Sequence, residues 1–252
     1  MADNPRRIGL LVAASDRVVE ADFHAFLPKR ISFHSARLYQ SLRSTTASLD
    51  ALAELANSAE PSAASVARAE PELIVFACTA ASMLKGRGWE TEIARRISTI
   101  TGIPAITTAE AIVTAINALA LRRLFLLSPY GNEILRLTAA FIEAHGVAVA
   151  GSAAFSCEKI GDVPAITPAQ IRTSVLANRT AIQKSSGLLI GGASVRVLGM
   201  IEDLERELGV PVVSSNQATL WLALRRLKVD GSRIPLGRLL QAPSGARASR
   251  VA

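Results

Sequence analysis

The sequence predicts an α/β fold made of two pseudo-symmetric lobes, each a mostly parallel sheet flanked by helices. Short runs rich in Ile, Val and Leu alternate with longer segments of helical periodicity, which is typical of βα units. Half of the 252 residues are hydrophobic and only 4% are aromatic, as expected for parallel strands buried among Ala-rich helices. Segments of the first half also recur, in the same order, in the second half.

The strands are expected where short aliphatic runs occur, namely at 7–13, 31–38, 73–77, 123–128, 147–155, 188–191 and 211–214. The apolar run 8–14 also has features of a short secretion signal, because Arg6 and Arg7 precede it. Asp16 and Arg17 follow that run immediately, however, and its apolar length is the minimum for such a signal, so we interpret it as the first strand.

The helices are expected where apolar residues recur with helical spacing, near 45–69, 90–101, 108–120, 131–145, 168–185, 196–208 and 217–228. Gly146 and Gly209 follow two of these segments. Glycine is favoured there because the residue after a helix often adopts a left-handed conformation.

Three pairs of segments indicate an internal duplication. Residues 6–11 match 122–127, residues 73–78 match 187–192, and residues 101–108 match 208–215. Because the three matches come in the same order, a duplicated lobe explains them better than chance. We predict a first lobe at 1–115 plus about 216–240, a second lobe at 116–215, and a flexible basic tail at 241–252.

Duplication also predicts where a ligand binds. Parallel α/β sheets bind ligands beyond the carboxyl ends of their strands, so two facing lobes would enclose a small molecule between equivalent loops. The candidate loops contain small or polar residues and lie at 14–16, 78–82, 107–108, 129–132, 192–196 and 214–216.

Composition argues against several other classes of protein. The net charge is +7, but no aromatic stacking platform or nucleic-acid motif accompanies it, so no nucleic-acid partner is expected. Two cysteines and three histidines without ligand spacing predict neither disulfides nor a metal site. No glycine-rich cofactor motif and no run of about 18 apolar residues is present, so we expect no cofactor, no membrane segment and a cytoplasmic location.

Cys78 and Tyr130 are the candidate chemical groups. Cys78 follows an apolar strand and precedes small residues, so backbone N–H groups could approach a carboxylate there and lower the thiol pKa. The alternative is a buried core cysteine. Tyr130 lies at a strand end, where it could donate to a developing oxyanion or only cap the lobe interface. Cys157 has no partner pattern and is expected to be inert.

The segments 74–82 (IVFACTAAS), 127–130 (LSPY) and 209–215 (GVPVVSS) resemble the maleate isomerase and arylmalonate decarboxylase branch of the aspartate/glutamate racemase superfamily. The resemblance covers roughly residues 6–228 and includes the order of the motifs. It implies two α/β lobes, an active site between them and cofactor-independent chemistry beside a carboxylate.

The cysteine positions differ from the family patterns. In the racemases, one cysteine on each side of the substrate removes or returns a proton. Cys78 occupies the first position, as in maleate isomerases, whereas Gly192 occupies the second. Arylmalonate decarboxylase has glycine first and cysteine second, so this chain departs from all three patterns. The space at Gly192 is expected to accept a larger substituent.

A single cysteine disfavours two-base racemisation but is sufficient for two other reactions. As a thiolate it can add to maleate, allow rotation about the resulting single bond and leave to give fumarate. As a thiol it can protonate one face of the enediolate that forms when a malonate loses CO₂.

The resemblance also assigns binding positions. Tyr130 and the N–H groups around Thr79, Ala80, Ala193 and Ser194 match the groups that hold the carboxylate and its oxyanion. The other candidate substrate-binding residues are Ser15, Asp16, Asp162, Gly192 and Arg196.

Three charged residues, Asp16, Asp162 and Arg196, each allow two interpretations. Asp16, after Ser15, and Asp162 both stand where maleate isomerases have asparagine, and two carboxylates would repel a dianionic substrate and raise the thiol pKa. Arg196 could compensate by holding a carboxylate bidentately, or it could face solvent. The residues Asp16, Glu20, Asp22 and Phe23 are also similar to the ectoine-utilisation protein A group, which would suit a substrate with a positive charge.

We therefore predict a cofactor-independent isomerase of a small dicarboxylate, with Cys78 as nucleophile and with Asp16 positioning the substrate. The alternatives are an arylmalonate decarboxylase-like lyase, an ectoine-utilisation-type enzyme and a non-catalytic carboxylate-binding protein. A small carboxylate or dicarboxylate is the expected partner, and Ala-rich helices make a homo-oligomer plausible.

Overall fold

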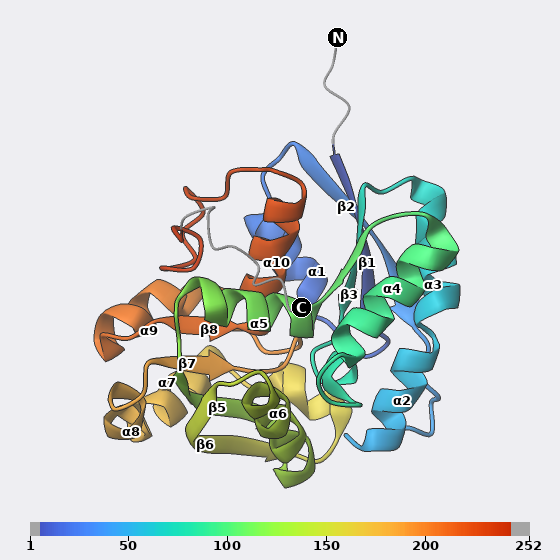
Figure 1. Ribbon diagram of the computed structural model, residues 1–252. Coiled ribbons are helices and arrows are strands. Elements are labelled where there is room, and N and C mark those ends of the chain that lie inside the picture. Colours follow the sequence, from blue (N-terminus) through green and yellow to red (C-terminus); the bar gives the residue numbers. More distant parts are fainter. Residues whose placement is uncertain (1–5, 243–252) are drawn as a thin grey trace.

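The structure, a computed structural model, describes residues 6–242 and contains two four-stranded parallel sheets (Figure 1). The first sheet has the order β2-β1-β3-β4 and the second the order β6-β5-β7-β8. The first four strands are β1 (Arg6–Ala13), β2 (Ile31–Leu38), β3 (Leu73–Ala77) and β4 (Ala105–Thr107). The others are β5 (Arg123–Tyr130), β6 (Ala148–Cys157), β7 (Gly187–Ile190) and β8 (Val212–Ser214).

The two sheets confirm the α/β class and the two pseudo-symmetric lobes. The repeated segments occupy equivalent places, because β1 and β5 are the second strands of their sheets and β3 and β7 are the third. All residues of β3 and β7 are buried, as expected for central strands covered on both faces.

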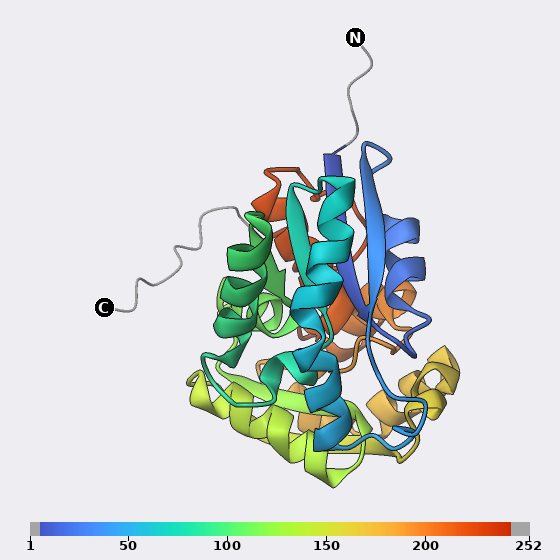
Figure 2. The same ribbon diagram turned by 90° about the vertical axis from the view of Figure 1, so that its right-hand side faces the viewer.

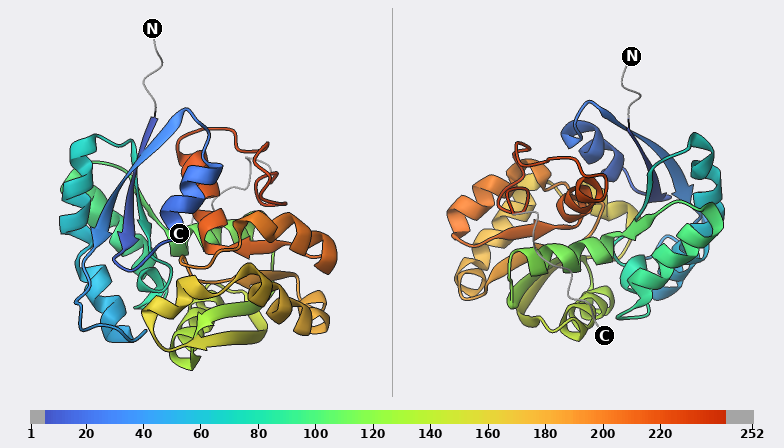
Figure 3. Two further views of the ribbon diagram at one scale, coloured as in Figure 1. Left: turned by 180° about the vertical axis from the view of Figure 1, so that it is seen from behind. Right: turned by 45° about the horizontal axis from the view of Figure 1, so that its top comes forward.

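Ten α-helices surround the sheets in the described part of the chain. They are α1 (Val19–Phe26), α2 (Leu49–Asn57), α3 (Ala59–Val66), α4 (Trp89–Thr101), α5 (Thr108–Ala118), α6 (Asn132–Ala144), α7 (Pro168–Ala177), α8 (Arg179–Gln183), α9 (Ile201–Leu208) and α10 (Ser215–Arg226). Figure 2 shows α2, α3 and α4 on one side of the first sheet, and Figure 3 shows α1 beside α10 on its other side. On the second sheet, α6 packs on β5 and β6, and α8 packs on β5, β6 and β7.

The helix α10 joins the two halves. It follows β8 of the second sheet but packs against α5 and β3, and the hydroxyl of Thr219 bonds that of Thr108 at 3.1 Å. This packing is compatible with assigning the segment after 215 to the first lobe. The exact lobe boundaries remain a prediction, and most of the predicted basic tail, from 243 onwards, lies outside the described residues.

Several elements differ from the sequence prediction. The expected helix 45–69 divides into α2 and α3 at Ser58, whose hydroxyl accepts the N–H of Tyr39 and donates to the Leu55 carbonyl. The strand β4 and the helix α1 were not predicted. Of α1, only Val19 and Phe23 are buried, so the helix has no long apolar stripe. Among residues 6–242, no helix is long and apolar enough to cross a membrane.

Candidate active site

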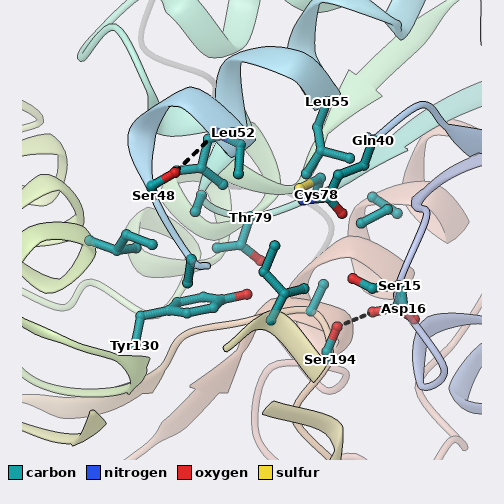
Figure 4. Close-up of a pocket in the computed structure, with 18 residues that line it drawn as sticks. Ser15, Asp16, Gln40, Ser48, Leu52, Leu55, Cys78, Thr79, Tyr130 and Ser194 are labelled. Carbon is teal, nitrogen blue, oxygen red and sulfur yellow. Dashed lines mark hydrogen bonds between the residues drawn. The ribbon is translucent and has the colours of Figure 1, made fainter. Parts of the chain in front are cut away.

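A pocket with about 520 Å³ of empty space, partly open to solvent, lies between the lobes beyond the carboxyl ends of the strands (Figure 4). Both lobes contribute to its lining. The polar lining residues are Ser15, Asp16, Gln40, Ser48, Cys78, Thr79, Tyr130 and Ser194, and the apolar ones are Ala13, Ala47, Ala51, Leu52, Leu55, Ala77, Ala80, Ile134, Ile160 and Ala193. The structure thus brings together Cys78, Tyr130, Ser15, Asp16, Thr79, Ala80, Ala193 and Ser194 of the predicted site.

Cys78 is nearly enclosed at the end of β3. The residue is only 7% exposed. Burial raises the thiol pKa to about 12, although a hydrogen bond from the Ala81 N–H lowers it in part. Asp16 adds to the rise by charge repulsion. A nearby N–H thus lowers the thiol pKa as expected, but desolvation outweighs it, so the expected net lowering is wrong. At neutral pH Cys78 is a thiol.

The loop after Cys78 is fixed by its own hydrogen bonds. The hydroxyl of Ser82 donates to the Thr79 carbonyl at 2.8 Å and accepts the Ala109 N–H at 3.1 Å. None of the hydrogen bonds among residues 6–242 uses the N–H groups of Thr79 and Ala80. The Thr79 hydroxyl is also buried without a partner. These donors are consequently available to an anionic ligand.

The opposite loop, after β7, presents a second pair of donors. Among the described residues, no hydrogen bond uses the N–H groups of Ala193 and Ser194. The Asn216 amide donates to the Ala193 carbonyl at 2.8 Å and to Asp22 at 2.7 Å, which fixes the orientation of this peptide. The two loops therefore offer backbone donors from both lobes to one ligand.

A side chain at residue 192 would collide with its neighbours. The φ of Gly192 is +98°, and a Cβ built there would lie 2.7 Å from Pro129 Cγ and 3.0 Å from Val195 Cγ2. The expectation that this position accepts a larger substrate substituent stays a prediction, because the collision concerns a side chain at residue 192, and Gly192 itself lines a second pocket with Thr79, Ala80 and Tyr130. No second cysteine can be accommodated at residue 192 without movement of its neighbours.

Asp16 connects the lobes. One of its carboxylate oxygens accepts the N–H groups of Val18 and Val19, both at 2.8 Å, and so caps α1. The other accepts the Ser194 hydroxyl at 2.5 Å, as Figure 4 shows. Asp16 lines the pocket but is only 3% exposed. Protein donors engage both oxygens, so the structure gives Asp16 a role in holding the Ser194 loop rather than in binding a substrate cation.

Asp162 and Arg196 are exposed and do not line the pocket with Cys78. In the turn that carries Asp162, the buried residues are Val163 and Pro164, and Asp162 lines a neighbouring hollow that shares Ser15, Gln40 and Ile160 with the pocket. Arg196 lies between buried Val195 and Val197 and faces the outer side of α1, near Asp22. Their predicted contact with the substrate is therefore not supported by the structure.

Tyr130 ends β5, and Figure 4 shows its hydroxyl directed into the pocket below Thr79. Burial raises the pKa of its phenol, and the nearby Cys78 and Asp16 raise it further. Tyr130 is therefore a neutral hydrogen-bond donor throughout the physiological range.

The sequence analysis missed the residues that cover the pocket. Leu52 and Leu55 come from α2, and Gln40 follows β2. The segment before α2 pairs with the second lobe, since the Ala47 N–H bonds the Glu158 carbonyl at 2.8 Å and the Ile160 N–H bonds the Thr45 carbonyl at 2.9 Å. A polar residue just beyond the strand 31–38 is the signal that could have found Gln40; nothing in the sequence places α2 over the pocket.

Charged groups are scarce in the lining. Among the described residues that line this pocket, Asp16 is the single charged one, and none is Lys, Arg or His. Among residues 6–242, no cluster of three His, Cys, Asp or Glu side chains could hold a metal ion. A carboxylate in this pocket would be held by neutral donors, namely backbone N–H groups and hydroxyls.

Comparison with known proteins gives consistent relatives. Residues 8–240 match the arylmalonate decarboxylase family. The chain is 31% identical to the maleate isomerase of Nocardia farcinica over 97% of its length and 99% of that protein. It is 28% identical to the arylmalonate decarboxylase of Bordetella bronchiseptica over 58% of this chain and 61% of that protein.

A solved structure adds chemical detail. It is a cysteine-to-serine mutant of the Nocardia farcinica maleate cis-trans isomerase with a covalently bound succinylcysteine intermediate. The similarity has a TM-score of 0.87 and 29% identity, and it covers 95% of this chain and 99% of that one. The chain belongs to the arylmalonate decarboxylase family, in the branch of the aspartate/glutamate racemase superfamily that also contains the maleate isomerases.

Proposed function

We propose that this protein is a cofactor-independent cis-trans isomerase of a small unsaturated dicarboxylate of the maleate class, with Cys78 as nucleophile. The observation that carries the proposal is the position of Cys78, which lies between unused backbone donors of the two lobes in one pocket. The covalent succinylcysteine in the Nocardia farcinica relative supports it, because that intermediate is what thiol addition to maleate gives.

The reaction begins with addition of the Cys78 thiolate to one alkene carbon. A C–S bond forms, the π bond breaks, and its electron pair moves into the adjacent carboxylate to give an enediolate. Tyr130 and the N–H groups of Thr79, Ala80, Ala193 and Ser194 stabilise this added charge, because neutral donors in a desolvated site favour an oxyanion strongly.

Rotation and elimination complete the cycle. The former double bond is now a single bond, so the substrate can rotate about it into the trans arrangement. The enediolate then re-forms the alkene and expels the same thiolate, which releases fumarate. The proton of Cys78 passes to solvent before addition. Where the enediolate carbon takes up a proton to give the succinyl thioether, it loses a proton again before the thiolate is expelled.

One observation favours a second candidate function. Because burial raises the thiol pKa to about 12, Cys78 is well suited to donate a proton. In a decarboxylase, a malonate would lose CO₂ to leave an enediolate, and the Cys78 S–H would protonate its carbon. The resulting thiolate would then regain a proton from solvent.

Proton NMR in D₂O separates the two reactions. Maleate and phenylmalonate are incubated separately with the wild type, with Cys78→Ala and with the control Cys157→Ala. The isomerase proposal predicts fumarate, formed by the wild type and by Cys157→Ala but not by Cys78→Ala. Deuterium at an alkene carbon of that fumarate would show that the enediolate is protonated to the succinyl thioether on the way. Deuterated phenylacetate would establish decarboxylation instead. Maleate turnover by Cys78→Ala would exclude the nucleophile assignment, and binding of either acid without turnover would favour a carboxylate-binding protein.

A further inference from the structure

We infer that Gln40 determines substrate specificity by donating a hydrogen bond to the acceptor group at the far end of the substrate, which can be neutral as well as charged. This inference rests on the proposed function and names its substrate class: cis-unsaturated acids that carry one carboxylate and a second carbonyl-type acceptor. The half-amide of maleic acid belongs to this class.

The first observation is an unused donor. Gln40 lines the pocket, and its Nε2 is buried without a hydrogen-bond partner among the described residues. Buried amide donors in native proteins are nearly always paired, because an unpaired one loses its hydration without compensation. A donor left unpaired inside a ligand pocket is explained if a ligand supplies its acceptor.

The second observation is the position of this donor. Figure 4 shows Gln40 and Leu55 beside Cys78 on one side of the pocket, with Tyr130 and Ser194 on the other side. The backbone donors and Tyr130 suit the carboxylate that becomes the enediolate. Gln40 then faces the other end of a substrate that lies across Cys78.

The third observation concerns charge. The lining of the pocket includes the aliphatic residues Leu52 and Leu55 and contains no cation among the described residues. Lys159 lies in the adjoining hollow, which Gln40 also lines. A second carboxylate is therefore not paired with a positive charge in this pocket. A neutral amide offers Gln40 the same carbonyl oxygen at a lower desolvation cost, so the second charge should not be required.

The test compares three substrates and two binding measurements. The substrates are maleate, its half-amide and cis-but-2-enoate, which lacks the second acceptor. The variants are Gln40→Met, which keeps the chain length but removes the donor, and Gln183→Met as a matched control on α8, where the amide bonds the Leu208 carbonyl. Binding of maleate and the half-amide is measured by calorimetry in the Cys78→Ala background, with and without Gln40→Met.

We expect the wild type to convert maleate and the half-amide with kcat/KM values within about ten-fold of each other, and cis-but-2-enoate at least about ten-fold less well. Gln40→Met should lower kcat/KM for the first two about ten-fold, mainly through KM, and weaken binding by a similar factor. The pH dependence of kcat should stay unchanged, and Gln183→Met should resemble the wild type.

Three results would overturn the inference. The first is an unchanged KM and binding constant in Gln40→Met. The second is a half-amide that neither binds nor reacts while maleate does. The third is a loss confined to kcat with an altered pH profile, which would mean that Gln40 acts on the sulfur of Cys78 and not on the substrate. If the wild type converts none of the acids, the proposed function fails. The calorimetric comparison still decides whether Gln40 binds the second acceptor.

Discussion

Placing a second cysteine at residue 192 should destabilise the protein rather than create a two-base racemase. In Gly192→Cys the new Cβ meets Pro129 Cγ at 2.7 Å and Val195 Cγ2 at 3.0 Å, with the backbone at φ +98°. A left-handed non-glycine residue costs about 1–2 kcal/mol, and overpacking adds about 1–3 kcal/mol. We therefore expect the free energy of unfolding to fall by roughly 2–5 kcal/mol.

Urea unfolding followed by circular dichroism measures this loss, with two matched variants. Gly192→Ala should lose nearly as much as Gly192→Cys, because the collision and the strain both arise at Cβ. Gly191→Ala should lose much less, since its Cβ would meet only the Leu127 carbonyl, at 3.8 Å. If Gly192→Cys unfolds within about 1 kcal/mol of the wild type, the argument that Pro129 closes this face is refuted.

Three further predictions concern charge and the connection between the lobes. Ser194→Ala removes the hydroxyl that bonds Asp16 at 2.5 Å. It should lower the free energy of unfolding by about 1–3 kcal/mol, because it leaves a buried carboxylate oxygen unpaired. Urea unfolding checks this, with Ser152→Ala on the edge strand β6 as the control. The pKa of Cys78 is raised from 9.0 to about 12. The wild type should therefore lose stability relative to Cys78→Ala as the pH rises above 9, by about 2–3 kcal/mol at pH 11. Equal dependence of the unfolding free energy on pH in the two proteins would contradict the raised pKa. Burial raises the pKa of Asp22 from 3.8 to about 6. The free energy of unfolding of the wild type should therefore rise by about 2 kcal/mol relative to that of Asp22→Asn when the pH falls from 7 to 4. A fall, measured by urea unfolding at these two pH values, would mean that the pKa of Asp22 is lowered in the folded protein, not raised.

The parallel topology made part of the site predictable from sequence. Once 73–77 and 188–191 are interpreted as equivalent strands, Cys78 and Ala193 must lie at the same edge of two facing sheets, and the structure places both in the pocket. Sequence periodicity does not determine which way a side chain points in an irregular turn. Asp162 was placed in the site by the resemblance and Arg196 by its place in the loop after 188–191, and neither argument fixes the direction of the side chain, which is exposed in both cases.

The cover of the pocket depends on tertiary contacts. The division of 45–69 into α2 and α3 depends on the bond from the Tyr39 N–H to Ser58, two residues that lie 19 positions apart. That break allows α2 to place Leu52 and Leu55 over Cys78. Gln40 was missed for a related reason, because the loop after the edge strand 31–38 reaches the pocket only through this arrangement.

The buried thiol gives the two candidate reactions opposite requirements. With a pKa of about 12, only about one Cys78 in 10⁵ is a thiolate at pH 7, and this fraction rises ten-fold with each pH unit. Isomerisation that starts from the thiolate should therefore accelerate about ten-fold per unit between pH 7 and 9, whereas decarboxylation, which uses the thiol, should not change. A maleate isomerase activity that is flat over this range would mean that the proton leaves sulfur during the addition itself.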